Sequence, residues 1–132
     1  MRKTPTTIHP QLSRILSELG HTDELFVADA GLPIPSGVER VDLAYRKGAP
    51  AFLDVLDVIL DEIVVEGAVM PAEVAEASPE MLRAVQDRLA PLEVVLVPHE
   101  QYKRRSHGAR AVVRTGEYTS YANVALIAGV DY

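Results

Sequence analysis

The sequence contains no cysteine and no tryptophan, and five of its few aromatic residues are tyrosines. The absence of cysteine excludes disulfide bonds, thiolate catalysis, iron–sulfur clusters and zinc sites built on cysteine. The scarcity of aromatic side chains predicts an aliphatic core, so each tyrosine in a loop requires a specific explanation. The length of 132 residues predicts a single domain over residues 1–132, large enough to bury roughly two-thirds of its unfolded surface.

Positive charge is also scarce, because 13 Lys and Arg stand against 19 Asp and Glu, for a net charge of −6. This balance argues against a broad phosphate-binding face, so nucleic acid is not an expected partner. The longest apolar run, residues 122–130, is interrupted by Asn123 and Gly129, whereas a membrane span needs about 18 apolar residues. The charged start of the chain is followed by no apolar stretch. We therefore expect a cytoplasmic protein that does not enter a membrane.

Several familiar catalytic motifs are missing from the chain. It has no phosphate-binding P-loop, no glycine-rich dinucleotide fingerprint, no serine nucleophile elbow and no paired-histidine zinc motif. The sequence thus gives no sign of nucleotide binding, hydride transfer or serine hydrolysis. The pairs His21/Asp23 and His99/Glu100 are too sparse to predict a metal site.

Apolar periodicity predicts helices and strands that alternate along most of the chain. Helices are expected over 10–19, 50–62 and 78–90, with weaker helical signals over 71–77 and 100–106; strands are expected over 25–28, 40–45, 63–70, 92–97, 111–113 and 123–128. This alternation indicates an α/β domain whose helices cover a mainly parallel sheet. The connection between the last two strands is too short for a parallel crossover, so an antiparallel pairing is expected near the C-terminus.

Polar side chains follow several of the predicted strands. Ligands of open α/β sheets bind outside the carboxyl ends of the strands, so these side chains are candidates for one pocket. The candidates are Asp29, His99, Lys103, Thr115, Glu117, Tyr118, Tyr121 and Asn123, with His21 only eight residues before Asp29. Ordinary structural roles stay open: a histidine after a helix end serves as a cap, and an aspartate before glycine forms a turn.

A set of short motifs carries a resemblance to a known family. They are Gly20-His21-Thr22-Asp23, Asp29-Ala30-Gly31-Leu32-Pro33-Ile34-Pro35, Gly37-Val38-Glu39-Arg40, Val65-Glu66-Gly67-Ala68, His99-Glu100, Arg114-Thr115-Gly116-Glu117 and Tyr121-Ala122-Asn123. Together, and in this order, they resemble the ribose pyranase/fucose mutarotase family nearly from end to end. The match is weakest over 71–92. The resemblance implies a three-layer α/β/α fold with a mixed, mainly parallel six-stranded sheet.

The resemblance also implies an activity and the residues that carry it. The family interconverts the β-pyranose and β-furanose forms of D-ribose without a metal or organic cofactor. It forms rings of subunits, commonly stacked into homodecamers, with the pocket at a subunit boundary. The family's catalytic histidine corresponds to His21, and its sugar-binding positions correspond to Asp29, His99, Lys103, Tyr121, Ala122 and Asn123.

The residue types suit this chemistry. Ring interconversion passes through the open-chain aldehyde, and an imidazole both accepts and donates protons near neutral pH. Asp29 is expected to accept a hydrogen bond from a sugar hydroxyl and to orient the imidazole of His21. Three alternatives stay open: an L-fucose mutarotase, a non-catalytic sugar-binding protein, and an oligomeric α/β domain with no site.

Overall fold

A computed structural model describes residues 1–4 and 6–132 of the chain. Its strands are β1 (Glu24–Ala28), β2 (Glu39–Asp42), β3 (Val65–Pro71), β4 (Val94–Val97), β5 (Ala111–Arg114) and β6 (Val124–Ala128). Its helices are α1 (Pro10–Glu18), α2 (Phe52–Glu62), α3 (Val74–Ala77), α4 (Pro79–Leu89) and α5 (His99–Arg105), followed by a 3₁₀ turn at Ser106–Gly108. None of the described helices is both long and apolar enough to cross a membrane.

The six strands form one mixed sheet in the order β2-β5-β1-β6-β3-β4. Strands β2, β5 and β1 are parallel neighbours, as are β3 and β4, whereas β6 runs antiparallel to both β1 and β3. The predicted mixed, mainly parallel α/β sheet is therefore confirmed. The expected antiparallel pairing involves β6 and its neighbours β1 and β3, because β1 lies between β5 and β6.

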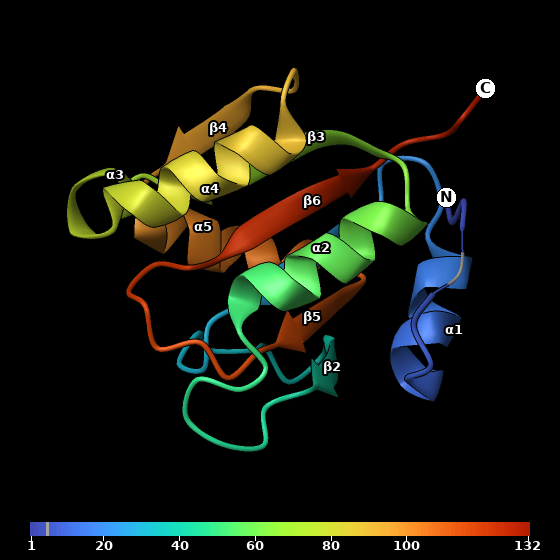
Figure 1. Cartoon of the computed structure of the whole chain (residues 1–132), viewed down its shortest axis with the longest axis horizontal. Helices are drawn as coiled ribbons and strands as arrows, with labels where there is room; N and C mark the ends of the chain where they lie inside the picture. Colours follow the sequence, from blue (N-terminus) through green and yellow to red (C-terminus); the bar gives the residue numbers. More distant parts are fainter. Residues whose placement is uncertain (5) are drawn as a thin grey trace.

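Both faces of the sheet are covered, which gives three layers. Alternate residues of β1 point to opposite faces: Leu25 and Val27 join the larger core under α1, α2 and α4, while Phe26 packs against Tyr102 of α5. Figure 1 shows α2 and α4 lying across one face of the sheet. The core is mainly aliphatic, as the composition predicts, and Phe26, Phe52 and Tyr102 are its fully buried aromatic residues.

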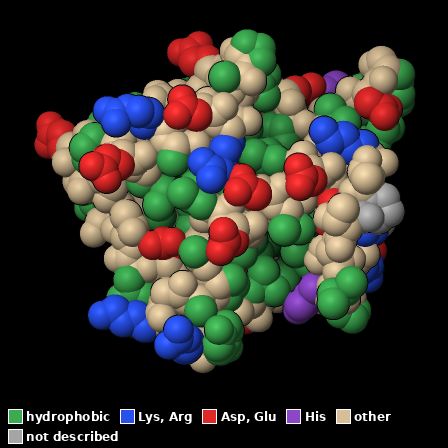
Figure 2. All heavy atoms as spheres, in the orientation of Figure 1, with side chains coloured by type: hydrophobic (Ala, Val, Ile, Leu, Met, Phe, Trp, Pro, Cys, Tyr) green, Lys and Arg blue, Asp and Glu red, His purple; other side chains and the backbone are tan. Residues whose placement is uncertain are grey.

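The outer sides of these helices are polar. Asp54, Asp57 and Asp61 of α2 are exposed, and Asp57 pairs with Arg88 of α4 at 2.6 Å. Figure 2 shows acidic and basic side chains spread over this face of the molecule. The predicted amphipathic helix over 50–62 is confirmed, with α2 beginning two residues later, after Pro50.

The strand predicted over 40–45 is shorter than expected. Strand β2 ends at Asp42, and Tyr45, which shares one side of the predicted alternation with Val41 and Leu43, is 75% exposed. The chain leaves the sheet here to form a turn in which the N–H of Tyr45 donates to the Ala49 carbonyl at 3.2 Å. The alternation of Val41, Leu43 and Tyr45 therefore predicts the strand but not its end.

Candidate active site

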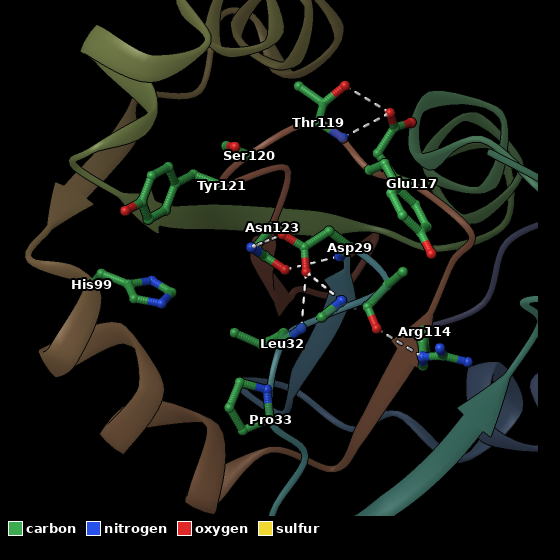
Figure 3. A pocket seen from close by; sticks show the side chains of 13 residues that line it. Asp29, Leu32, Pro33, His99, Arg114, Glu117, Thr119, Ser120, Tyr121 and Asn123 are labelled. Atoms are coloured by element: carbon green, nitrogen blue, oxygen red, sulfur yellow. Dashed lines mark hydrogen bonds between the residues drawn. The ribbon is translucent and has the colours of Figure 1, made fainter. Parts of the chain in front are cut away.

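A cavity of about 510 Å³ opens at the carboxyl ends of the parallel strands. It is lined by Asp29, Ala30, Gly31, Leu32, Pro33, His99, Arg114, Glu117, Tyr118, Thr119, Ser120, Tyr121 and Asn123. These residues follow β1, β4 and β5, the edge where a parallel sheet presents its ligand site. Figure 3 shows Asp29 and Asn123 at the centre of the cavity, with His99 and Tyr121 on one side.

Asp29 and Asn123 form a reciprocal pair of hydrogen bonds. The backbone N–H of Asp29 donates to Asn123 Oδ1 at 2.9 Å, and Asn123 Nδ2 donates to Asp29 Oδ2 at 3.1 Å. The other carboxylate oxygen, Asp29 Oδ1, accepts from the N–H groups of Gly31 and Leu32 at 3.0 and 2.9 Å. Asn123 is fully buried. The Asp29 carboxylate is thus held in one orientation, with its Oδ2 edge toward the cavity and able to accept a further hydrogen bond.

The segment Arg114–Thr119 ties the cavity to the rest of the fold. The Thr115 hydroxyl donates to the Ala28 carbonyl at 2.8 Å, and Gly116 lies so close to Ala49 that a Cβ at position 116 would stand 2.3 Å from the Ala49 carbonyl oxygen. Glycine is therefore required at position 116 by packing. The backbone carbonyl of Glu117 accepts from Ala30, next to Asp29.

Glu117 is a site residue whose role sequence patterns did not predict. Its Oε1 accepts from the Phe52 N–H at the start of α2 at 2.9 Å, and its Oε2 accepts from the Thr119 hydroxyl at 2.7 Å. Burial raises the pKa of Glu117, but hydrogen bonds from Phe52 and Thr119 outweigh burial and leave the pKa below its ordinary value. The carboxylate is therefore ionised near neutral pH and joins the cavity loop to α2.

His99 and Tyr121 present aromatic surface to the cavity. Their rings meet edge to face with centroids 5.1 Å apart. The backbone N–H of His99 donates to both carboxylate oxygens of Glu73, at 3.0 and 3.1 Å, which fixes the start of α5. Within the described part of the chain, His99 Nδ1 is buried without a hydrogen-bond partner. A buried polar atom without a partner is uncommon in folded proteins and marks His99 as a residue that needs a functional explanation.

Two of the predicted binding residues lie beside the cavity without lining it. Lys103 is one turn further along α5, where its Nζ pairs with Glu100 at 2.8 Å. The Ala122 side chain is fully buried in the larger core. Of the six predicted binding residues, the structure brings together Asp29, His99, Tyr121 and Asn123.

His21 lies at the amino-terminal ends of the parallel strands, opposite the cavity at their carboxyl ends. It precedes β1 while Asp29 follows it, so at about 3.3 Å per strand residue the two are roughly 20 Å apart. Its ring contacts Glu66, with Nε2 2.9 Å from Oε2, and its side chain is 54% exposed. Within one chain, His21 therefore neither lines the cavity nor contacts Asp29, contrary to the expected convergence of the two residues.

Backbone strain is present both in the turn that follows His21 and in the lining of the cavity. In the described chain, the non-glycine residues with positive φ are Thr22, at 72°, and Tyr121, at 61°. Such a conformation is unusual for a β-branched residue and costs on the order of 1–3 kcal/mol. One strained residue follows His21 directly and the other lines the cavity, so the two separated parts share a feature that is common at functional sites.

Comparison with known proteins links this arrangement to one family. The family model of the "RbsD / FucU transport protein family" matches residues 1–131. A protein named D-ribose pyranase from Laribacter hongkongensis is 49% identical over 125 residues, which are 95% of each chain. A second protein of that name, from Geobacillus kaustophilus, is 42% identical over 125 residues, which are 95% of this chain and 92% of the relative.

Solved structures agree with these relatives. The structure of Bacillus subtilis RbsD complexed with D-ribose matches with a TM-score of 0.94 and 39% identity, over 98% of this chain and 99% of the other. The fucose mutarotase of Streptococcus pneumoniae, in complex with L-fucose, matches with a TM-score of 0.81 and 26% identity, over 95% of each chain. With its fold, its motifs and nearly its whole length in agreement, the chain belongs to the RbsD / FucU family.

Proposed function

We propose that this protein is an isomerase that interconverts the β-pyranose and β-furanose forms of D-ribose. The relatives named D-ribose pyranase at 42–49% identity and the ribose complex of the similar Bacillus subtilis protein support this substrate. The L-fucose-binding relative is more distant in both sequence and structure.

The observation that carries the proposal is the fixed Asp29–Asn123 pair at the base of the cavity. A ribose ring presents several hydroxyl groups, each both a donor and an acceptor, so it needs a site with oriented partners of both kinds. Asp29 Oδ2 accepts, His99 Nδ1 lacks a partner in the described chain, and the Tyr121 ring offers an apolar face. Asp29, Glu117 and Arg114 line the cavity, and the charge of Arg114 is paired with Asp42 at 2.9 Å, so the site suits a neutral sugar better than an anionic one.

The working site is proposed to take residues from two copies of the chain. His21 is exposed at the amino-terminal edge of β1, whereas the cavity opens at the carboxyl-terminal edge. A head-to-tail contact between neighbours brings these two edges together, and such a contact closes into a ring when the rotation permits. The family resemblance implies a homodecamer of stacked pentameric rings, and head-to-tail contacts between neighbours are the kind that a ring requires.

In this arrangement, one copy supplies the acid and base and the second copy binds the sugar. His21 of one copy accepts the proton of the anomeric hydroxyl as the bond between C1 and the ring oxygen breaks, and it then delivers that proton to the ring oxygen. The aldehyde forms, and a different sugar hydroxyl attacks C1 to close the other ring size. Asp29, His99 and Tyr121 of the second copy hold the remaining hydroxyls and the carbon face. The proton inventory is unchanged over the cycle, so an imidazole suffices as acid and base.

Saturation-transfer NMR on equilibrated D-ribose tests the proposal. Adding the protein should accelerate pyranose–furanose exchange, and His21→Ala should abolish the acceleration while the protein stays folded. Acceleration for the anomers of L-fucose alone would transfer the assignment to a mutarotase. Binding of ribose without any acceleration would indicate a sugar-binding protein and overturn the enzymatic function.

Cytoplasmic location and decameric assembly belong to the same proposal. Subcellular fractionation tests the first. Sedimentation velocity tests the second, and a monomer at assay concentration would contradict the shared site.

A further inference from the structure

Glu66 is the extra residue of a β-bulge. The register between β3 and β6 shifts between Val65 and Gly67, which pair with Ala128 and Ile127 and leave Glu66 without a partner residue. A bulge bends the strand and turns a side chain in a direction that regular pairing does not allow, and bulges are common beside active sites. Here the bulge directs Glu66 toward the turn that carries His21.

The packing around Glu66 allows little freedom. A Cβ on Gly129 would lie 3.2 Å from Glu66 Cβ and 3.3 Å from Val64 Cγ1, and the Gly129 N–H donates to the Val64 carbonyl at 2.8 Å. The end of β6 therefore lies directly against the bulge. This contact fixes the backbone from which Glu66 projects.

The turn that carries His21 is held from the same strand. The Thr22 N–H donates to the Ala128 carbonyl at 2.8 Å, and the Ala128 N–H donates to the Asp23 carbonyl at 2.8 Å. Asp23 Oδ2 also accepts from the Gly20 N–H at 2.8 Å. The positive φ of Thr22 is the strained element of this turn. The bulge and the turn are thus built against one β6 end, and His21 Nε2 meets Glu66 Oε2 at 2.9 Å.

Stability does not account for this construction. Both side chains of the pair are more than 40% exposed, and exposed ion pairs contribute about 0–1 kcal/mol. The strained Thr22 costs about as much or more. An arrangement that combines a bulge and a strained residue to make a weak surface pair is better explained by function.

We propose that Glu66 is a positioning residue for His21. The carboxylate accepts a hydrogen bond from the Nε2–H group, which orients the ring and leaves the Nδ1 lone pair free toward the sugar. When Nδ1 takes the anomeric proton, the ring becomes an imidazolium whose Nε2–H stays bonded to the carboxylate, and the Nδ1 proton then passes to the ring oxygen. Glu66 remains ionised throughout and no net charge is gained. This inference rests on the proposed role of His21 as acid and base.

Two substitutions at Glu66 test the role. Glu66→Ala removes the acceptor and should lower kcat about 10- to 100-fold with KM within about twofold, because a hydrogen bond to a charged group is lost. Glu66→Gln keeps an amide oxygen in place and should recover part of that loss. Asp61→Asn, an exposed carboxylate on α2, is the matched control and should leave kcat unchanged. Sedimentation velocity verifies that each variant keeps the wild-type assembly.

Nitrogen-15 NMR of the imidazoles gives a second readout that a structural role would not affect. In the wild-type protein, the neutral form of the His21 ring should carry its proton on Nε2, and in Glu66→Ala this preference should weaken. A wild-type His21 with its proton on Nδ1 would overturn the inference. Full kcat in Glu66→Ala together with an inactive His21→Ala would overturn it as well and leave the proposed function standing. An active His21→Ala would overturn both.

Discussion

Replacing Asn123 by aspartate probes the centre of the site without changing its shape. Asn123 Nδ2 lies 3.1 Å from Asp29 Oδ2, so Asn123→Asp exchanges a donor for a second carboxylate oxygen at the same distance. Coulomb's law over 3.1 Å gives a repulsion of about 5 kcal/mol at an effective dielectric constant of about 20. Asn123 is fully buried, so solvent relieves little of this repulsion on its side of the pair.

The variant should lose about 3–5 kcal/mol of unfolding free energy at pH 7 and much less at pH 5. Two carboxylates in contact favour sharing one proton in the folded state, whereas the separated groups of the unfolded chain do not. The penalty is therefore present above the pH at which the pair takes up its proton and fades as the pH falls. Urea unfolding at both pH values, at equal protein concentration, measures the difference.

A double variant provides the control. Asp29→Asn combined with Asn123→Asp exchanges the two groups and restores one donor opposite one carboxylate, so it should recover most of the lost stability. An Asn123→Asp penalty of equal size at pH 5 and pH 7, or no recovery in the double variant, would refute the electrostatic reasoning.

Two further predictions concern the strained turn and the buried ion pair. Thr22→Gly relieves the positive φ of Thr22 and should raise the unfolding free energy by about 1 kcal/mol while lowering kcat, because the turn holds His21 less firmly; a loss of stability would show that the turn is unstrained. Glu62 is fully buried and pairs with Arg2 at 2.9 Å. Burial raises the pKa of Glu62, but hydrogen bonds from the Thr6 and Thr7 backbone and from Arg2 outweigh burial and leave the pKa below its ordinary value. The stability from Glu62 is therefore fully present above the ordinary carboxyl pKa and is lost as the pH falls through the lowered pKa of the folded state. Glu62→Gln should cost about 3 kcal/mol at pH 7 and flatten the acid side of the stability curve. An unchanged acid slope in urea unfolding would contradict this.

Much of the fold follows from apolar periodicity. The apolar stripes of α1, α2 and α4 and the apolar runs of β1, β4 and β6 are long enough to identify each element, and most boundaries agree within two or three residues. The apolar run of β4 predicts a buried strand, but β4 lies at the edge of the sheet, where Val95 and Leu96 are exposed. The order of strands in the sheet did not follow, because pairing depends on contacts between distant segments. The end of β2 at Asp42 did not follow either, because the chain leaves the sheet for the turn around Ala49 while the apolar alternation continues to Tyr45.

The cavity was predicted in part. Asp29, His99, Tyr121 and Asn123 were expected together because each follows a strand, and the structure brings them together. The same reasoning also predicts where His21 lies, because a residue before a strand and a residue after it are at opposite ends of that strand. The eight-residue separation of His21 and Asp29 in sequence suggests a proximity that the strand between them prevents.

The roles of Glu66 and Glu117 do not follow from the sequence pattern. Glu66 depends on a bulge and Glu117 on contacts with the distant start of α2, and neither has a signature in local periodicity. Both stand in motifs, Val65-Glu66-Gly67-Ala68 and Arg114-Thr115-Gly116-Glu117, that carry the family resemblance. Their contacts in the folded structure, with His21 for Glu66 and with the start of α2 for Glu117, indicate the role of each residue.

The most direct test of the account mixes two defective proteins. A His21→Ala chain and an Asp29→Ala chain, co-expressed with different tags and purified through both, form mixed assemblies. If each site takes His21 from one copy and Asp29 from its neighbour, random mixing leaves about a quarter of the sites intact. Ribose ring exchange should then return to about a quarter of the wild-type rate, while each variant alone stays inactive. Mixed assemblies no more active than the separate variants would contradict a site shared between two copies.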